Sequence, residues 1–193
     1  MSRISDLREK AATDPNVAFQ LGWSLLDGTC DTETGKEIKV RKNTKEGLYW
    51  LRVAAEKGIG EAMVGLGCHY GDTAKRSRSR LLAALYWEKK AWRANVERVG
   101  QNIAITYSML GKKRLCHQWL LRGYKRCKWS TRLSLAKTYL CGYGVRRNMP
   151  KAKKLFQDVL HDERSHPEHK KLARKYLRMI ERGEMPNDNV LYP

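Results

Sequence analysis

Apolar and small residues recur along the chain at the spacing of an α-helix. Around Leu66 they occupy Ala62, Gly67 and Tyr70, which lie four residues before, one after and four after the leucine. These positions share one helix face, because successive residues are rotated by about 100° around the axis. Similar arrangements surround Leu21, Ile103, Leu135 and Leu172. The pattern predicts five amphipathic helices, each with a small residue that lets a neighbouring helix approach closely.

A second helical pattern follows each of the first four helices and places a large residue three positions after a small one. The large residues are Trp50, Trp87, Trp119 and Leu155, which lie 37, 32 and 36 residues apart. The central residues of the first helices step by 45, 37, 32 and 37 residues. Two anchors with nearly the same step indicate tandem repeats of two helices. One helix pair cannot bury its own apolar face, so neighbouring pairs must stack.

The sequence therefore predicts an all-α fold, with one solenoid domain over residues 1–193. It would contain about four helix-turn-helix repeats and a C-terminal capping helix. The predicted units cover residues 14–58, 59–94, 95–128 and 129–164, with the capping helix at 165–183 and a tail at 184–193. Pro167 suits the first turn of the capping helix and Gly183 suits its end.

The repeats share the motif Ala-x3-Leu-Gly-x2-Tyr-x2-Gly-x-Gly-Val, followed by Lys-Ala-x2-Trp-x3-Ala-Ala. Its residues are Ala62, Leu66, Gly67 and Tyr70 in one repeat, Trp50, Ala54, Ala55 and Gly58 in another, and Tyr139, Gly142, Gly144, Val145, Lys151 and Ala152 in a third. Over residues 14–182 the chain resembles the Sel1-like repeat family. The resemblance implies a right-handed α/α superhelix that binds other proteins and has no catalytic residue. The second and third repeats depart from Gly-x-Gly-Val, with GDTAKRSRSR and GKKR instead.

The segment YLCGYGVRRNMPKAKKLF, residues 139–156, combines two glycines with five cations. A phosphate-binding loop needs GxxxxGK[ST] after a strand, and this segment has neither. In the repeat interpretation Gly142 ends one helix and Gly144 bends the backbone. Asn148 then caps the next helix, with Pro150 in its first turn. The segment is therefore predicted to be a turn, with its cations on the surface.

The first step of 45 residues is long because GTCDTETGKEIKVRKN, residues 28–43, is inserted between the two helices of the first repeat. The start of this insertion is typical of a loop, and EIKV has the pattern of a short extended segment. Insertions in repeat arrays often lie on a binding face. A surface loop without a binding role explains this segment equally well.

The net charge of +19 is distributed unevenly. Residues 1–61 carry ten acidic and ten basic side chains, whereas residues 62–193 carry ten acidic and twenty-nine basic ones. Residues 98–157 contain fifteen lysines and arginines and no acidic residue. Cations at this density repel one another. Such a charge excess is easier to explain if an anionic partner lies beside it. Solubility alone is the competing explanation.

The chain shows no recognisable catalytic or metal-binding constellation. The five cysteines lack CxxC spacing and are expected to be reduced, buried thiols. Cys116 and His117 are neighbours on a helix, so their side chains diverge and do not form a thiolate–imidazole pair. His166 and His169 could form a metal pair, but no further ligands accompany them. No apolar run is long enough to span a membrane, and the N-terminus has no apolar signal region. We expect a cytoplasmic protein without a transmembrane segment, enzymatic activity, cofactor or metal.

The wheel positions −1, +2 and +3 from each central residue are expected to line a concave surface formed by the stacked first helices. We call this set the concave ladder, and it runs from neutral to cationic residues. Its candidate partner-binding residues are Gln20, Trp23, Ser24, His69, Asn102, Thr106, Ser134, Lys137, Thr138, Lys171, Arg174 and Lys175. Trp23 is the tryptophan expected to be exposed. A solvated groove without a partner is the alternative interpretation.

A second cationic set, which we call the basic flank, lies in the turns and helix starts between the repeats. Its residues are Lys75, Arg76, Arg78, Arg80, Lys112, Lys113, Arg114, Arg146 and Arg147.

These features favour a non-enzymatic scaffold that binds an acidic protein or peptide, for example as an inhibitor or immunity-type protein. The alternative is an RNA- or DNA-binding protein that contacts phosphates with the same cations and reads no bases. Against it, no nucleic-acid-binding motif is present, and the aromatic residues are not interleaved with the cations along the sequence. An adaptor on an anionic membrane surface is a third hypothesis, but no amphipathic helix stands outside the repeats.

Overall fold

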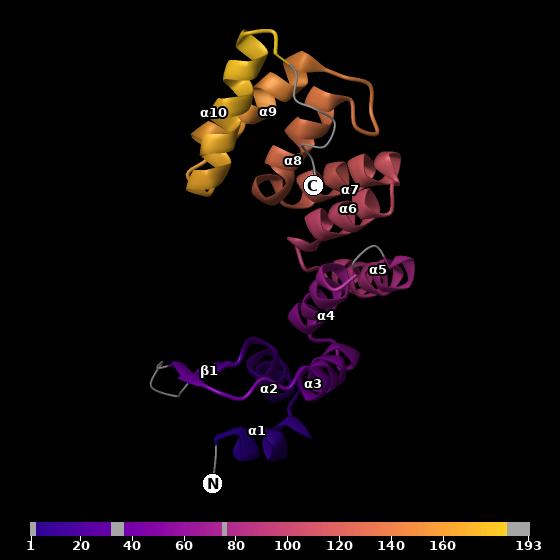
Figure 1. Ribbon diagram of the computed structural model, residues 1–193, viewed down its shortest axis with the longest axis vertical. Helices are drawn as coiled ribbons and strands as arrows, with labels where there is room; N and C mark the ends of the chain where they lie inside the picture. The colour runs from indigo at the N-terminus through magenta and orange to yellow at the C-terminus, as the bar shows by residue number, and fades with distance from the viewer. Residues whose placement is uncertain (1–2, 32–36, 75–76, 185–193) are drawn as a thin grey trace. The chain divides into compact units, whose positions relative to one another are not determined.

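The computed structural model describes residues 3–31, 37–74 and 77–184, which contain ten α-helices and one two-stranded antiparallel sheet (Figure 1). The chain divides into two compact units. Unit 1 consists of Met1–Lys75 and Leu82–Val96, and unit 2 of Arg76–Leu81 and Glu97–Pro193. Both units are built from packed helices, so the predicted all-α class is confirmed. Within the described residues no helix has the length and apolarity that crossing a bilayer requires.

Unit 1 begins with a helix that precedes the predicted repeats. Its elements are α1 (Arg3–Ala11), α2 (Pro15–Asp27), β1 (Thr29–Asp31), β2 (Glu37–Lys39), α3 (Thr44–Glu56), α4 (Gly60–Asp72) and most of α5 (Arg78–Arg93). Helix α2 packs against α1 and α3, and α3 packs against α4. Strands β1 and β2 form a hairpin within the inserted segment, with Cys30 paired to Ile38. The extended segment expected at EIKV is therefore present as β2.

Close contact between α2 and α3 depends on two glycines. A Cβ atom added at Gly22 would lie 2.8 Å from the Leu51 backbone nitrogen and 2.9 Å from the Gly47 carbonyl oxygen. A Cβ atom added at Gly47 would lie 2.9 Å from the Gly22 carbonyl oxygen. No larger side chain fits between these backbones without a shift of one helix. The predicted role of the small residue after Leu21 is therefore confirmed.

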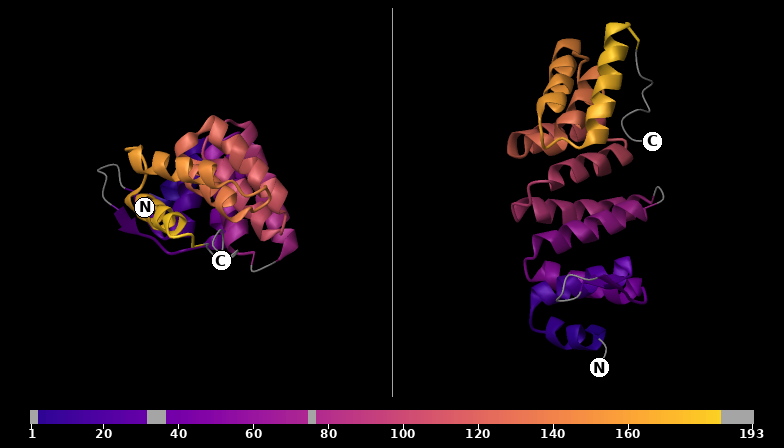
Figure 2. Two further views of the ribbon diagram at one scale, coloured as in Figure 1. Left: turned by 90° about the horizontal axis from the view of Figure 1, so that it is seen from above. Right: turned by 90° about the vertical axis from the view of Figure 1, so that its left-hand side faces the viewer.

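In the described part of the chain, unit 2 contains the first turn of α5 and five further helices. These helices are α6 (Val99–Met109), α7 (Lys113–Arg126), α8 (Lys128–Cys141), α9 (Met149–His161) and α10 (Pro167–Glu181). Each helix packs against the next one in sequence, and α6 also contacts α8. Helices α9 and α10 lie side by side at the C-terminal end of the described chain (Figures 1 and 2).

The segment between α8 and α9 is the turn that the sequence predicts. Gly142 follows α8 in the left-handed conformation with φ of 71°, which favours glycine. The Asn148 side chain accepts a hydrogen bond from the Lys151 backbone nitrogen and caps α9. A Cβ atom added at Gly144 would lie 2.1 Å from the Lys113 carbonyl oxygen. Gly144 therefore lets the turn lie directly on the start of α7.

The repeated anchors form the core of both units. Leu21, Leu66, Ile103 and Leu135 are fully or almost fully buried. Trp87, Trp119 and Leu155 retain less than a tenth of their exposed area, as the second helical pattern predicts. Trp50 is only partly buried, and its indole nitrogen lies 3.4 Å from the Glu46 carboxylate. Burying large aromatic side chains supplies much of the apolar stabilisation in a repeat array.

Candidate functional site: a cationic face in unit 2

Helix α10 carries cations on the face directed away from α9. The helix begins at Pro167, with the His166 ring accepting a hydrogen bond from the Glu168 backbone nitrogen. Its buried side is formed by Ala173 and Tyr176, and the Tyr176 ring stacks on Phe156 of α9 with 5.2 Å between centroids. These contacts fix the rotation of α10 about its axis.

The opposite side of α10 lines an open cavity of about 770 Å³. Its lining residues are Glu168, Lys171, Leu172, Arg174, Lys175, Arg178, Met179, Arg182 and Glu184. We call this surface the α10 cationic face. Lys171 lies 3.9 Å from Glu168 and Arg182 lies 3.8 Å from Glu184, but both pairs are exposed and therefore weak. Arg174, Lys175 and Arg178 have no ion-pair partner within the described residues.

Lys137 of α8 links this helix to the rest of the unit. Its Nζ lies 5.6 Å from the centre of the Tyr176 ring, within the range of a cation–π interaction. Burial lowers the pKa of Lys137, because the ammonium group loses part of its hydration. The same lysine contributes to lowering the pKa of His169, for which burial is the largest cause. Lys137 therefore joins a half-buried polar cluster between α8 and α10.

Lysines also cover two other tyrosine rings in unit 2. Lys113 lies 5.2 Å from the centre of the Tyr143 ring, and Lys151 lies 5.4 Å from that of Tyr139. The Tyr143 hydroxyl is 2.7 Å from the Ser108 hydroxyl. Cations and aromatics that are separate in sequence are therefore paired in the fold, in contrast to the expectation from sequence. Each pairing occupies a ring face that a nucleic-acid base would need for stacking.

A buried polar pair connects α7 to α8. His117 Nδ1 lies 2.9 Å from the Thr138 hydroxyl, which itself donates to the Leu135 carbonyl oxygen at 2.7 Å. Because the single hydroxyl proton goes to Leu135, the histidine nitrogen is the donor in this pair. Burial lowers the pKa of His117, and the charge on Lys151 lowers it further. His117 is therefore a neutral structural residue and has no thiolate partner, since burial raises the pKa of Cys116 to about 12.

A second buried contact ties α8 to the end of α9. Arg132 donates to the Asp158 carbonyl oxygen at 2.8 Å and to the Asp162 carboxylate at 3.0 Å. Arg164 also donates to Asp162, and its hydrogen bond is the main reason that the pKa of Asp162 is lowered. One of the many cations in this unit is therefore used to hold the helices together.

The structure revises part of the concave ladder. Trp23 is half exposed as expected, and Gln20 and the three α10 cations are exposed. His69, Asn102, Ser134 and Lys137 are only partly accessible. Ser24, Thr106 and Thr138 are buried, so their assignment to a binding surface is wrong. They occupy wheel position +3, which is only about 60° from the central residue and faces the neighbouring helix.

Most of the basic flank is on the surface. Lys112, Lys113, Arg114, Arg146 and Arg147 are exposed in unit 2. Arg78 and Arg80 are also exposed and lie in the first turn of α5. Lys75 and Arg76 lie outside the described residues. The α10 cationic face has five cations on α10 or at its C-terminal cap. The concave ladder includes three of them, Lys171, Arg174 and Lys175, whereas Arg178 and Arg182 belong to neither predicted set.

Groups that could support catalysis or metal binding are not assembled in the described chain. No cluster of three or more potential metal ligands occurs within the described residues. The rings of His166 and His169 approach to 6.0 Å between centroids, but His166 is engaged as the cap of α10. The five cysteines are not joined in disulfides, and three of them are buried.

Comparison with solved structures places this arrangement of helices in a known class. The chain is similar to a protective antigen of uropathogenic Escherichia coli that displays an SLR fold, with a TM-score of 0.72 and 21% identity over 99% of this chain. It is also similar to a Sel1 repeat protein from Oxalobacter formigenes, with a TM-score of 0.65 and 21% identity over 90% of this chain.

These similarities show that the chain has the fold of Sel1-like repeat proteins, as its motif indicates. The chain spans 39% of the length of the first structure and 63% of the second. No family model and no curated protein matches the sequence.

Proposed function

We propose that this protein is a non-enzymatic scaffold that binds an acidic segment of a partner protein on the α10 cationic face. The observation that carries the proposal is the arrangement on α10 of cations around Leu172 and Met179. These two residues are seven positions apart and therefore share one helix face. A partner segment that alternates carboxylates with apolar side chains matches both the charge and the apolar strip.

The same arrangement favours protein over nucleic acid. A phosphate backbone would bind the cations but would place its polar surface over the apolar side chains of Leu172 and Met179. A lysine lies over one face of each of the rings of Tyr139, Tyr143 and Tyr176, so a base that stacked on that face would have to displace it. Non-specific binding of RNA or DNA is therefore the second candidate. Inhibition of an acidic enzyme or toxin, as by an immunity-type protein, is one form that the first candidate could take.

A triple charge reversal tests the proposal. Lys171→Glu, Arg174→Glu and Lys175→Glu together should abolish capture of acidic proteins from a nuclease-treated lysate. The matched control reverses three other exposed cations of unit 2, Arg147, Lys153 and Lys154, and has the same net charge. The control should retain capture, and both variants should keep their helical circular-dichroism signal.

The outcome separates the two candidates. Loss of capture in the α10 variant alone supports a protein site on this face. Nucleic acid is the partner if nuclease removes all captured material and if both variants bind random oligonucleotides more weakly than the unmodified chain by the same amount. The proposal is then wrong. Capture that survives in the α10 variant would also contradict it.

A further inference from the structure

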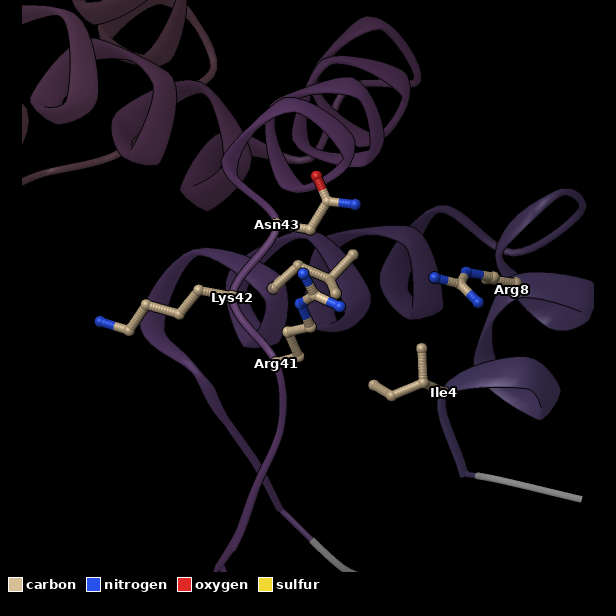
Figure 3. Close-up of a pocket in the computed structure, with 6 residues that line it drawn as sticks. Ile4, Arg8, Arg41, Lys42 and Asn43 are labelled. Atoms are coloured by element: carbon tan, nitrogen blue, oxygen red, sulfur yellow. The ribbon is translucent and has the colours of Figure 1, made fainter.

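Unit 1 contains a separate pocket, bounded by α1, the end of α2 and the segment between β2 and α3. It has a volume of about 620 Å³, within the range of small-ligand sites. Its lining residues are Ile4, Arg8, Leu25, Arg41, Lys42 and Asn43. Figure 3 shows the guanidinium groups of Arg8 and Arg41 directed toward the same space from opposite sides. The pocket is independent of the function proposed for unit 2.

The inserted segment builds one wall of the pocket. The Val40 backbone nitrogen donates to the Gly28 carbonyl oxygen at 2.9 Å, and the Asn43 backbone nitrogen donates to the Leu25 carbonyl oxygen at 2.9 Å. These bonds satisfy carbonyl groups at the end of α2 that have no partner within the helix. Arg41 lies between the two bonds, so its backbone position is fixed.

Lys42 lines the pocket, but its ammonium group is directed away from it. A Cβ atom added at Gly28 would lie 2.7 Å from Lys42 Cε, so the lysine stem packs over this glycine. Gly28 has a φ of 87°, which favours glycine at this position, and its lack of a Cβ atom leaves room for the lysine stem. In Figure 3 the Lys42 ammonium extends away from the space between the arginines. The two neighbouring cations are therefore directed to different places.

Arg8 forms the opposite wall and is oriented by Glu46. Its Nε lies 2.6 Å from Glu46 Oε1, and its Nη2 lies 2.9 Å from Oε2. The Asn43 amide also donates to Glu46, at 3.0 Å. The hydrogen bond from Arg8 is the main reason that the pKa of Glu46 is lowered. This contact uses one edge of the guanidinium group and leaves Nη1 and the outer edge available to a ligand.

The charges of the lining residues select the ligand. Glu46 compensates Arg8, and Lys42 points elsewhere, so Arg41 supplies the one uncompensated positive charge among the described groups that face the pocket. One net charge matches a carboxylate better than a phosphate dianion. Arginine forks fit the planar carboxylate group through paired hydrogen bonds. The partly exposed Ile4 and the edge of the nearly buried Leu25 line the pocket beside it and are apolar.

We infer that this pocket binds a carboxylate carried on a short aliphatic stem. The outer edge of Arg8 and the guanidinium group of Arg41 donate hydrogen bonds to the carboxylate oxygens. The aliphatic stem packs against Ile4 and Leu25. Two sources have this chemistry, namely the C-terminal aliphatic residue of a peptide and a free branched short-chain carboxylic acid.

Titration calorimetry with three probes tests the inference on the full chain. The probes are acetyl-Gly-Gly-leucine with a free carboxylate, the same peptide as its C-terminal amide, and 4-methylpentanoate. The free peptide or 4-methylpentanoate should bind saturably, and the amide should bind at least about tenfold more weakly because it lacks the charge. Binding of 4-methylpentanoate identifies a free acid as the ligand, whereas binding of the peptide acid alone identifies a chain terminus.

Two adjacent variants provide the control. Arg41→Gln should weaken binding of the carboxylate probe about tenfold, whereas Lys42→Gln should change it less than about twofold. Arg41→Lys should be intermediate, because it keeps the charge and loses the fork. Equal binding of acid and amide, equal weakening by the Arg41 and Lys42 variants, or no saturation with either carboxylate at about 10 mM would overturn the inference. Circular dichroism should show unchanged helicity, since both side chains are exposed.

Discussion

Unit 1 and unit 2 are built from the same kind of helix pair but differ in charge and in the residues they expose. Unit 1 contains fourteen lysines and arginines against twelve acidic residues, whereas unit 2 contains twenty-five against eight. Within the described residues the large aromatic side chains that stay exposed, Trp23, Tyr49 and Tyr86, are all in unit 1. In unit 2 lysines lie over the rings of Tyr139, Tyr143 and Tyr176, and His117, Arg132 and Thr138 are buried polar residues.

The difference shows how little of each helix the repeat constrains. Stacking requires an apolar or small residue at the central positions and a large one at the anchor, and both units provide these. The remaining positions can carry any charge without loss of the fold. The cationic character of unit 2 is therefore not a requirement of the fold. Four predictions test this comparison.

The largest effect is expected at the anchors that both units share. Trp87→Ala in unit 1 and Trp119→Ala in unit 2 should each lower the free energy of unfolding by about 3–5 kcal/mol, because each removes a buried indole. Tyr86→Ala, one residue from Trp87, should cost less than about 1 kcal/mol because Tyr86 is exposed. Urea unfolding followed by circular dichroism measures all three. Equal losses of unfolding free energy at Tyr86 and Trp87 would contradict the burial of Trp87 and the exposure of Tyr86.

A smaller effect is expected where unit 1 depends on glycine. Gly22→Ala should destabilise by about 1–3 kcal/mol, because its new methyl group would meet the Leu51 and Gly47 backbones. Gly71→Ala is the control, since a Cβ atom there has no described neighbour within 4 Å. It should be neutral or stabilising by up to about 1 kcal/mol. Hydrogen exchange should show the loss caused by Gly22→Ala in α2 and α3.

The buried polar pair of unit 2 should have a comparable or slightly smaller effect. Thr138→Val removes the acceptor of His117 Nδ1 and should cost about 1–2 kcal/mol, because the buried N–H is left without a partner. Thr138→Ser keeps the hydroxyl and should lose less. Thermal unfolding of the two variants checks the order. A more stable valine variant would show that the hydrogen bond is not required.

The smallest effect is a dependence of unit 2 stability on pH. The pKa of His117 lies below its ordinary value of 6.5 in the folded chain. As the pH falls below 6.5, the unfolded chain therefore takes up the proton first, and stability decreases toward the lowered pKa. Above pH 6.5 this contribution is constant. His117→Asn keeps a donor toward Thr138 and removes the titration, so hydrogen exchange of α7 and α8 should become less sensitive to acid. If the sensitivity to acid is unchanged, another group, such as His169, causes the pH dependence.

The helical elements could be predicted from sequence because their signals are local. The spacing around Leu135, the cap at Asn148 and the glycine at 142 each act within a few residues, and all were found as expected. Two elements have weaker signals. Helix α1 precedes the first repeat and was missed, and β1 could not be predicted because a strand of three residues forms only with its partner.

The site residues were harder to predict. The helical wheel predicts burial well for residues two positions after the central residue but poorly for those three positions after it. At +3 the neighbouring helix determines whether the side chain is buried. The wheel therefore placed Lys137 correctly at the surface edge and Thr138 wrongly. The α10 cations were recognised only in part, because the sequence shows a charge excess without showing which cations gather around Leu172 and Met179.

By itself the sequence determined the class of fold, the turn at residues 139–156 and the excess of positive charge in the second half. These follow from periodicity, from the backbone preferences of glycine, proline and asparagine, and from composition. Only the tertiary structure decided which lysine lies on which tyrosine and that Arg8 of α1 faces Arg41 of the insertion. Such pairs join residues between 12 and 39 positions apart along the chain. Their contact depends on how closely the helices pack, which no local pattern records.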